Sequence, residues 1–466
     1  MPIDILPDNV LLEIFDLCLH DHSNSSIKRA NKWHRLVHVC QRWRRIIFES
    51  PCRLDLHISY TYGTPVWRNL HVWPVTLPLT IDYPYYSSRL VPEDKLNIFA
   101  ALEHPGCIHR IAICAEGSFL SHVAVFMHKP FPALTHLELI WAPPHTGRGS
   151  PSPGRHLGGF PLHLQLPVIL SSARNLVSLT LREISQDVSV LPETLVGCLA
   201  VLNALKTLDI TFPDDQSPLD STNSRSDLPR RTILPALTNF HYKGYSEYLE
   251  DILAQLDTPQ LDNCEIEYFV HLIQAHQLTH FIDRTEGLNH RQFKRAEVTF
   301  FSLAHRAQIN CSEGKYPQLS LDIVEQSGLG IQVECFADML GQVVAMFPNV
   351  DQLSVHEDSV DPTSMESAEW IPFFCLFHAV EALHLSGGVT AYIVSALEDI
   401  GEEMVTDVFP ALHLIWLDED KKYHEPLKPV GSIERFLSLR QLSGLPVTIV
   451  RTEDEFFADN SDRKSL

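Results

Sequence analysis

Histidine and cysteine are the residue types in this chain that could bind a metal ion or act as nucleophiles. His34 and His38 lie four residues apart in a segment with helical spacing, which would place both imidazoles on one side of a helix. No carboxylate or third ligand accompanies them nearby, and His20 and His22 lie in a polar stretch. We therefore interpret all four as ordinary surface or hydrogen-bonded histidines, and we expect neither a metal site nor a cofactor.

The cysteines do not form a recognisable reactive pattern. The chain has 10 of them, spread singly from Cys18 to Cys375, without a C-x-x-C pair. In a long chain this spacing is typical of reduced, mostly buried thiols. Nucleophile elbows, zinc-protease helices, phosphate loops and dinucleotide fingerprints are missing from the sequence. We expect that the protein is not an enzyme. A hydrolase with a dispersed Cys–His site stays an alternative, because such residues meet only in the folded chain.

Composition indicates a globular protein with an acidic surface. The 466 residues carry a formal net charge of −22, and 45% of them are hydrophobic. The negative charge disfavours binding to nucleic acid or to an anionic membrane surface. The first 16 residues lack the positive charge of a signal peptide, and the most apolar run, 370–385, is interrupted by Pro372, His378 and Glu381. We expect an intracellular protein, cytoplasmic or nuclear or both.

A short pattern recurs along most of the chain: an apolar anchor, then four to six positions at which apolar and polar residues alternate. The clearest copies cover 131–141, 173–184, 202–212, 234–245, 258–269, 347–358, 377–388 and 409–420, and weaker copies cover 51–60, 77–83, 107–114, 296–303 and 316–324. Alternation with a period of two predicts a strand with one buried face in each copy.

Helix-like stretches separate many of these copies. They cover 92–106, 193–203, 246–259, 334–348 and 432–444, and proline or glycine often ends them. Repeated strand–helix units predict an α/β solenoid, with a parallel sheet and helices on its outer face. The pattern resembles an irregular leucine-rich-repeat horseshoe, although the asparagine ladder of regular repeats is missing. A non-repeating α/β domain is the alternative.

Three parts of the chain can be distinguished. We predict a helical module at 1–51, the solenoid at 52–452 and a polar tail at 453–466. Two stretches rich in Pro, Gly, Ser or charged residues, at about 142–160 and 213–232, are expected to be long loops within the solenoid.

The first 51 residues predict two or three short amphipathic helices. Pro7 and Asp8 are favoured at a helix start. The first apolar stripe comprises Val10, Leu11, Ile14, Phe15 and Leu17, and the second comprises Val39, Cys40, Trp43, Ile46 and Ile47. The second helix also carries Arg42, Arg44 and Arg45, a dense positive patch in an acidic protein.

This module resembles the F-box. Leu6-Pro7 matches the opening Leu-Pro of that family, Val39-Cys40 with Trp43 matches its Val-Cys-x-x-Trp, and Ser50-Pro51 matches its usual end. The linker between the helices is longer and more polar than in the family. The resemblance implies docking onto a Skp-family adaptor, and through it onto a cullin. The residues implied in that contact are Leu6, Pro7, Ile14, Phe15, Val39, Cys40, Trp43 and Ile46.

The positive charges between Lys28 and Arg45 would favour an acidic partner. The alternative is that Arg42, Arg44 and Arg45 form a solvated face. The helices could also be no more than a cap on the solenoid, because repeat arrays need capping units.

The alternation also predicts which side chains lie on the open face of the sheet, the face without helices. Such a face can bind an extended partner. The candidates for target binding are His136, Glu138, Arg182, Asp209, His241, Lys243, Glu265, Glu267, His356, His384, Trp416 and Asp418. The later copies expose more acidic residues, which favours a basic target. Together with these repeats, the F-box resemblance implies a substrate-receptor subunit of a cullin-type ubiquitin ligase, and the alternative is an interaction scaffold without a ligase.

Overall fold

The computed structural model describes most of the repeat region and much of the N-terminal helical module. The described residues are 5–19, 36–49, 58–60, 78–83, 90–142, 162–183, 191–213, 231–269, 275–289, 293–301, 306–312, 319–324, 333–343, 347–357, 370–418 and 433–451. The tail at 453–466, nearly all of both predicted loops, and His20, His22 and His34 lie outside them. The chain divides into an N-terminal unit, Met1–Phe212, and a C-terminal unit, Pro213–Leu466.

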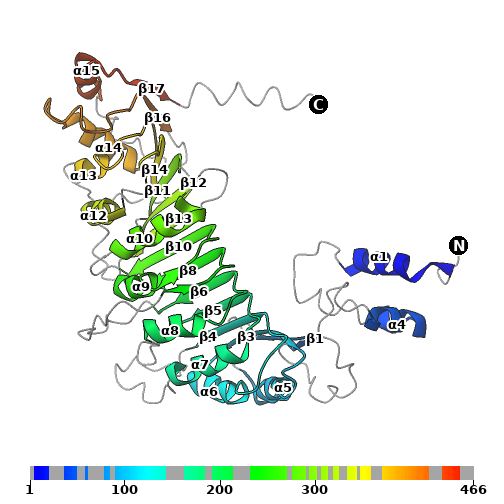
Figure 1. Cartoon of the computed structure of the whole chain (residues 1–466). Coiled ribbons are helices and arrows are strands. Elements are labelled where there is room, and N and C mark those ends of the chain that lie inside the picture. The colour runs from blue at the N-terminus through cyan, green and yellow to red at the C-terminus, as the bar shows by residue number, and fades with distance from the viewer. Residues whose placement is uncertain are drawn as a thin grey trace. The chain divides into compact units, whose positions relative to one another are not determined.

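The N-terminal unit combines a helix pair with a parallel sheet (Figure 1). The pair consists of α1 (Asp8–Leu19) and α4 (Gln41–Glu49). The strands are β1 (Ile58–Tyr60), β2 (Leu79–Tyr83), β3 (Ile108–Ala115), β4 (His136–Trp141), β5 (Ser178–Arg182) and β6 (Thr207–Thr211), paired in that order and all parallel. The helices of the repeats are α5 (Pro92–Leu102), α6 (Gly117–Phe126), α7 (Leu162–Ser172) and α8 (Pro192–Leu199).

The C-terminal unit repeats the strand–helix alternation. Its strands are β7 (Thr232–Ile233), β8 (Asn239–Gly244), β9 (Leu256–Asp257), β10 (Asn263–Phe269), β11 (Arg295–Phe301), β12 (Arg306–Ser312), β13 (Leu319–Val324), β14 (Gln352–Glu357), β15 (Ala382–Ser386), β16 (Leu414–Asp418) and β17 (Thr448–Arg451). Its helices are α9 (Ser246–Leu253), α10 (His276–Arg284), α11 (Glu286–Asn289), α12 (Val333–Val343), α13 (Trp370–Phe374), α14 (Val389–Glu398) and α15 (Glu434–Leu442).

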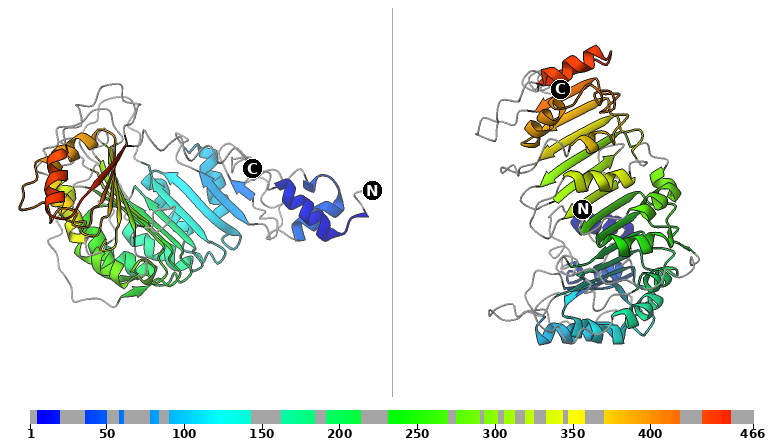
Figure 2. Two further views of the ribbon diagram at one scale, coloured as in Figure 1. Left: turned by 90° about the horizontal axis from the view of Figure 1, so that it is seen from above. Right: turned by 90° about the vertical axis from the view of Figure 1, so that its left-hand side faces the viewer.

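Within each unit the helices lie along one face of the strands and leave the other face open (Figure 2). Alternate strand residues point toward the helices: Leu353 and Val355 of β14 are fully buried, whereas His356 between Val355 and Glu357 is only half-buried. Helix α14 packs against β14 and β15, and α9 packs against β8. The predicted fold class, an α/β solenoid of the leucine-rich-repeat kind with helices on the outer face, is confirmed.

The apolar anchors form hydrogen-bonded turns ahead of the strands. The N–H of Leu134 donates to the C=O of Phe131 over 3.2 Å, and both side chains are fully buried; Leu412 and Phe409 repeat this bond at 2.9 Å. Proline follows each phenylalanine, a position in which its fixed φ favours a turn. The hydrophobic pair thus fixes where each strand begins, so the alternation of every copy starts in the same register.

Backbone bonds join these turns from one repeat to the next. The N–H of Thr135 donates to the C=O of His109 (2.9 Å), that of Val177 to Thr135 (2.7 Å) and that of Lys206 to Val177 (2.7 Å). Buried backbone groups of a repeat array need such partners. The backbone bonds thus connect neighbouring repeats, and the side chain of Asn175 adds another, donating from Nδ2 to the C=O of Pro132 at 2.7 Å.

One strand departs from the prediction of a wholly parallel sheet. The order in the C-terminal unit is β8-β10-β13-β12-β11-β14-β15-β16-β17, and β12 is antiparallel to both β11 and β13. Only four residues, 302–305, separate β11 from β12, which is too few for the crossover that a parallel neighbour requires. The short connection therefore forces the antiparallel direction.

The cysteines differ from the expectation of mostly buried thiols. All eight whose side chains are described are unpaired, but only Cys264 and Cys311 are buried, and Cys18 is exposed. The prediction was wrong because a cysteine can lie beside the buried residues of a helix and still be partly accessible to solvent, as Cys198 is on α8.

Candidate functional site

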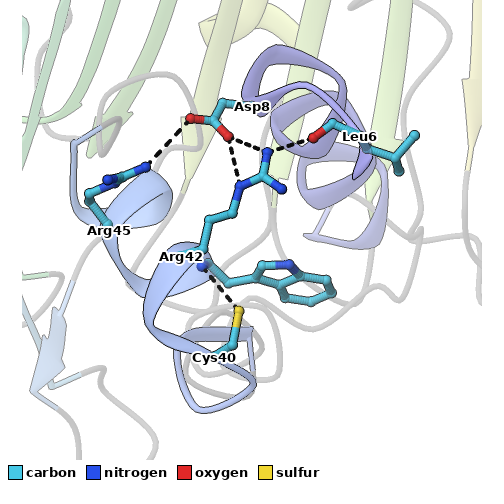
Figure 3. Close-up of polar contacts among 6 residues, drawn as sticks. Leu6, Asp8, Cys40, Arg42 and Arg45 are labelled. Atoms are coloured by element: carbon cyan, nitrogen blue, oxygen red, sulfur yellow. Dashed lines mark hydrogen bonds and ion pairs between the residues drawn. The ribbon is translucent and has the colours of Figure 1, made fainter. Parts of the chain in front are cut away.

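A polar contact joins the start of α1 to α4 (Figure 3). Arg42 donates from Nη2 to Oδ1 of Asp8 (2.6 Å) and to the C=O of Leu6 (2.5 Å), and from Nε to the same Oδ1 (3.0 Å). Arg45 reaches the other carboxylate oxygen of Asp8 at 3.9 Å. Asp8 stands in the first turn of α1, where a carboxylate also favours the helix dipole. The start of α1 is thus fixed against α4.

Cys40 and Trp43 build the start of α4. The N–H of Trp43 donates to the Sγ of Cys40 at 3.5 Å (Figure 3). The N–H of Arg44 donates to the C=O of Cys40 at 3.1 Å. Cys40 therefore occupies the N-cap position, where a side-chain acceptor satisfies an otherwise unpaired N–H. The Arg44 side chain donates back to the C=O of Val37 (3.0 Å). The Val-Cys-x-x-Trp spacing has a local structural reason.

Two residues implied in adaptor contact are buried in the helix pair itself. Phe15 is 0% exposed and its ring lies 4.7 Å from that of Trp43, and Ile46 is 3% exposed. Direct contact of Phe15 or Ile46 with a partner is therefore excluded in this conformation. Leu11 and Ile47 share this small core, since the apolar stripes of the two helices face each other.

The other implied residues remain accessible. Pro7 is exposed, Val39 is 59% exposed, and Leu6, Ile14, Cys40 and Trp43 are half-buried. Val39 precedes α4 and does not belong to its apolar stripe, contrary to the spacing argument. Val10 and Leu17, expected on the inner stripe of α1, are exposed as well, at 37% and 74%. Pro7 and Val39, expected in the adaptor contact, and Val10 and Leu17, expected only in the apolar stripe of α1, together give the helix pair an exposed apolar surface.

The arginines of α4 are divided between internal contacts and solvent. Arg42 and Arg44 make the bonds described above, whereas the side chain of Arg45 is 62% exposed. The alternative that all three form a purely solvated face is wrong for Arg42 and Arg44, because both hold backbone carbonyls.

On the open face of the N-terminal unit, charged residues of neighbouring strands form ion pairs. Arg110 lies 3.3 Å from Glu138, and Arg182 lies 2.6 Å from Asp209. Both guanidinium groups are about half-exposed above carboxylates that are more buried. The expected exposure of Asp209 is wrong: the residue is 6% exposed, because Arg182 covers it and Thr211 donates to it at 3.2 Å.

His136 lies beside these pairs in a half-buried position. The hydroxyl of Thr135 is 2.8 Å from its Nδ1. Burial, followed by the charges of Arg110 and His109, lowers the pKa of His136 below its usual value. This histidine is therefore neutral at physiological pH and offers hydrogen bonds, not a positive charge.

The open face of the C-terminal unit carries four of the candidates on adjacent strands. His241 faces Glu265 and Lys243 faces Glu267 in the β8–β10 register, and Lys243 is 2.8 Å from Glu267. Glu265 is exposed, whereas the other three are half-buried. Neighbouring side chains of opposite sign thus neutralise part of the acidic face.

Arg306 and Asp322 form an ion pair that sequence reasoning missed. Asp322 is 2% exposed and accepts from Nε of Arg306 at 2.8 and 2.7 Å, with a further contact from Nη2. Burial raises the pKa of Asp322 to about 6, against the opposite effect of Arg306. Arg306 also lies over the ring of Phe301. Arg306 begins β12, and the alternation of the buried residues Ala307, Ile309 and Cys311 was the signal in the sequence that could have identified this strand.

His384 and Trp416 form an aromatic pair at the other end of the same face. Their rings stack at 5.5 Å with an angle of 8° between the planes, and both side chains are half-buried. The β15–β16 register places them directly opposite each other, and Asp418 lies opposite Ser386. An accessible aromatic pair of this kind can carry binding energy at an interface.

Glu297, His356 and Ser386 follow one another across β11, β14 and β15. His356 Nε2 lies 2.6 Å from Glu297, and its Nδ1 lies 3.5 Å from the Ser386 hydroxyl. This is the order of a serine-hydrolase triad. However, the Glu357 carboxylate lies 2.7 Å from where a Cβ of Gly388 would stand, at the start of α14. A carboxylate there opposes the oxyanion that such a site must stabilise, so we assign no hydrolase site to these residues.

The described cysteines also give little support to a Cys–His site. Burial raises the pKa of Cys114 to about 11, with Glu138 and Glu183 adding to the effect, and raises that of Cys264 to about 12. A raised pKa disfavours the thiolate that a nucleophile needs. Among the described residues no group of three or more His, Cys, Asp and Glu side chains could hold a metal ion. Nor do those residues include a helix of the length and apolarity needed to cross a membrane.

Comparison with known proteins gives only remote likenesses. No model of a protein family matches the chain, and no curated protein matches it. Among solved structures, the leucine-rich repeat-containing protein LegL7 from Legionella pneumophila is similar at 13% identity, with 85% of this chain and 91% of that chain covered and a TM-score of 0.23. The Rad7 and Elc1 complex from yeast is similar at 12% identity, with 96% and 94% covered and a TM-score of 0.30. Likenesses this weak do not assign a family, and the fold assignment rests on the strands and helices themselves.

Proposed function

We propose that this protein is a substrate-receptor subunit of a cullin-type ubiquitin ligase. The helix pair α1–α4 would bind a Skp-family adaptor, and the open face of the repeats would bind the target. The protein would act by holding the target near the ligase, which raises its effective concentration. In this proposal the protein is intracellular, needs no cofactor, and uses none of its own residues for chemistry.

The observation that carries the proposal is the combination of a fixed helix pair with exposed apolar side chains. Arg42 and Asp8 lock the pair, and Phe15 with Trp43 fills its centre. Val39, at 59%, and Pro7 remain open to solvent. Exposed apolar side chains that lie together in this way are typical of a surface that binds a partner. Their agreement with the Leu-Pro and Val-Cys-x-x-Trp of the F-box resemblance supports an adaptor as the partner.

The electrostatics of the pair also suit such a partner. The side chain of Arg45 is 62% exposed, against 31% for that of Arg42. An acidic adaptor surface would meet it without breaking the Arg42–Asp8 contact. Charges of this kind increase association rate and orientation more than affinity.

The open face supports target binding by its accessible polar and aromatic groups. Glu265 is exposed, and the His384–Trp416 pair is half-exposed on the same face of the C-terminal unit. Extended polar faces of solenoids are suited to long contacts with a partner. The excess of acid in the whole chain, −22, supports a basic target segment.

Co-purification from a co-expression with a Skp-family adaptor tests the proposal. We expect the full chain to retain the adaptor through size-exclusion chromatography. Val39→Asp should abolish the complex, because it places a charge in the apolar contact. The matched control is Leu442→Asp, which changes a side chain that is 85% exposed on α15. Loss of the complex in both variants, or in neither, contradicts docking through the helix pair. Absence of any complex favours the scaffold alternative.

A further inference from the structure

Carboxylates and small side chains alternate along one row of the open face of the N-terminal unit. The strand register places Asp82, Ala112, Glu138, Thr180 and Asp209 side by side on β2 to β6. Neighbouring parallel strands lie about 4.8 Å apart. Ala112 therefore leaves a gap that has a carboxylate on each side.

A hollow of about 350 Å³ occupies this gap. The part of its lining that matters here is Asp82, Tyr83, Ala112, Cys114, Glu138 and Ile140. Ala112 and Ile140 provide its apolar part on the same face of the strands as the two carboxylates. The volume is at the lower end of ligand-binding cavities and suits a single long side chain better than a large ligand.

The charges around the hollow favour a cation. Arg110 and Arg182 also line it, but Arg110 is bonded to Glu138 and Arg182 to Asp209. Because Glu138 and Asp209 already balance these two guanidinium groups, Asp82 adds a negative charge to the lining. Asp82 lines the hollow. It makes no hydrogen bond or ion pair with another described residue.

We propose that this hollow binds the side chain of an arginine or lysine in an extended segment of the target protein. The aliphatic stem would lie on Ala112 and Ile140, and the charged end would lie between Asp82 and Glu138. Arginine and lysine both combine an apolar stem with a cationic end, which is the combination that the lining provides. The inference rests on the proposed function, because it concerns the target-binding face.

A segment of chain is the occupant that the surroundings favour over a free small cation. The hollow lies on the open sheet face, where polar side chains such as His136 and Thr180 continue the surface beside it. A backbone that crosses the strands could hydrogen-bond these side chains while one basic residue enters the gap. A free cation would gain only the contacts inside the hollow.

Selection from a phage-displayed library of random 12-residue peptides on the immobilised full chain tests the proposal. We expect enrichment of peptides with arginine or lysine at one fixed position. Ala112→Leu should weaken binding of a selected peptide about tenfold or more, because it fills the gap without changing any charge. Asp82→Asn, which keeps the shape, should weaken it by a smaller factor.

Thr180→Leu is the matched control. Thr180 is the other small residue of the same row, and it does not line the hollow. We expect this variant to bind the selected peptide as the wild type does. Circular dichroism and a melting curve for each variant establish that the fold is retained, and if Ala112→Leu unfolds, Asp82→Asn decides.

Three results would overturn the proposal. They are failure to enrich a basic position, equal binding by Asp82→Asn and the wild type, and equal loss in the Ala112 and Thr180 variants. N-acetyl-arginine amide is also tested for displacement of the peptide, at the concentration at which the peptide itself binds. Displacement would show that a small cation suffices, and it would contradict binding of an extended segment. Adaptor co-purification is measured separately, so failure of this site leaves the test of ligase association unaffected.

Discussion

Nη2 of Arg42 on α4 lies 2.6 Å from Oδ1 of Asp8 on α1, and this ion pair joins the two N-terminal helices. The same guanidinium group holds the C=O of Leu6, the residue that opens the Leu-Pro pair. A single arginine therefore links the two ends of the sequence signature, and its charge is used inside the molecule before any partner arrives.

Arg42→Ala should loosen the helix pair. The change removes two hydrogen bonds to one oxygen of a half-exposed carboxylate, so we expect a loss of about 1 kcal/mol of stability in the pair. Faster hydrogen exchange of the α1 amides, measured by mass spectrometry, would report it. Arg45→Ala, which removes only the 3.9 Å contact, serves as the control and should leave exchange unchanged. Equal exchange in both variants contradicts the role of Arg42.

Gly117→Ala should destabilise the N-terminal unit. A Cβ at this position would stand 1.9 Å from the ring of Trp141, so the indole must move. Overpacking of this kind costs about 1–3 kcal/mol. Urea unfolding of the full chain measures the loss.

Gly197→Ala is the control for that substitution. It also replaces a helical glycine, on α8, but nothing lies within 4 Å of the added Cβ. Because alanine favours a helix interior by about 0.5–1 kcal/mol over glycine, we expect a gain in stability. Destabilisation by both substitutions to the same degree would rule out the Trp141 contact as the cause.

Arg182→Ala should cost more stability than its exposed position suggests. Asp209 beneath it is 6% exposed and would keep a buried carboxylate without its cation. An uncompensated buried charge costs several kcal/mol, reduced here by the partial exposure of the pair to about 1–2 kcal/mol. In the double variant Arg182→Ala/Asp209→Asn much of that loss should return. A urea-unfolding double-mutant cycle without this recovery contradicts the pairing.

The stability contributed by His136 and His384 should fall as the pH drops from 7 to 5, whereas Asp322, whose pKa burial raises to about 6, acts in the opposite direction. Burial, followed by Arg110 and His109, lowers the pKa of His136, and burial, followed by Arg295, lowers that of His384. An unfolded imidazole takes up its proton near pH 6.5, about the value for a free side chain, whereas these two do so only at lower pH. The unfolded state then binds more protons, so the unfolding free energy decreases.

His136→Asn/His384→Asn should reduce this slope. Chemical unfolding at each pH measures it, and the interval from pH 7.5 to 8.5, above the titration of both histidines, gives the baseline. A slope between pH 7 and 5 that is as steep in the double variant as in the wild type would show that other groups cause the fall.

The strands and helices of the repeats were predictable because each depends on local patterns. In β16, Ile415 and Leu417 are buried and Trp416 is not, as the alternation indicates. The direction of β12 was not predictable in the same way. Alternation shows that one face of a strand is buried, but strand direction depends on the length of the connection and on the neighbours that it pairs with.

The sequence predicted which residues of the candidate sites lie on a given face of a helix or strand better than it predicted what those residues contact. Helical spacing identified Phe15 and Ile46 as apolar, but the same spacing fits contact with a partner or with the neighbouring helix, and the structure shows the second. Asp209 was expected to be exposed because its position on the strand is outward. Its burial depends on Arg182, 27 residues earlier, which no local pattern reveals.

Isothermal titration of a purified Skp-family adaptor into the full chain measures directly whether the helix pair binds an adaptor. We expect a Kd of about a micromolar or tighter for the wild type. We also expect no measurable heat for Val10→Asp/Val39→Asp, whose side chains are exposed on the helix pair, and wild-type affinity for Leu442→Asp. Absence of binding by the wild type, or equal affinity of the Val10→Asp/Val39→Asp variant, would contradict adaptor binding through the helix pair.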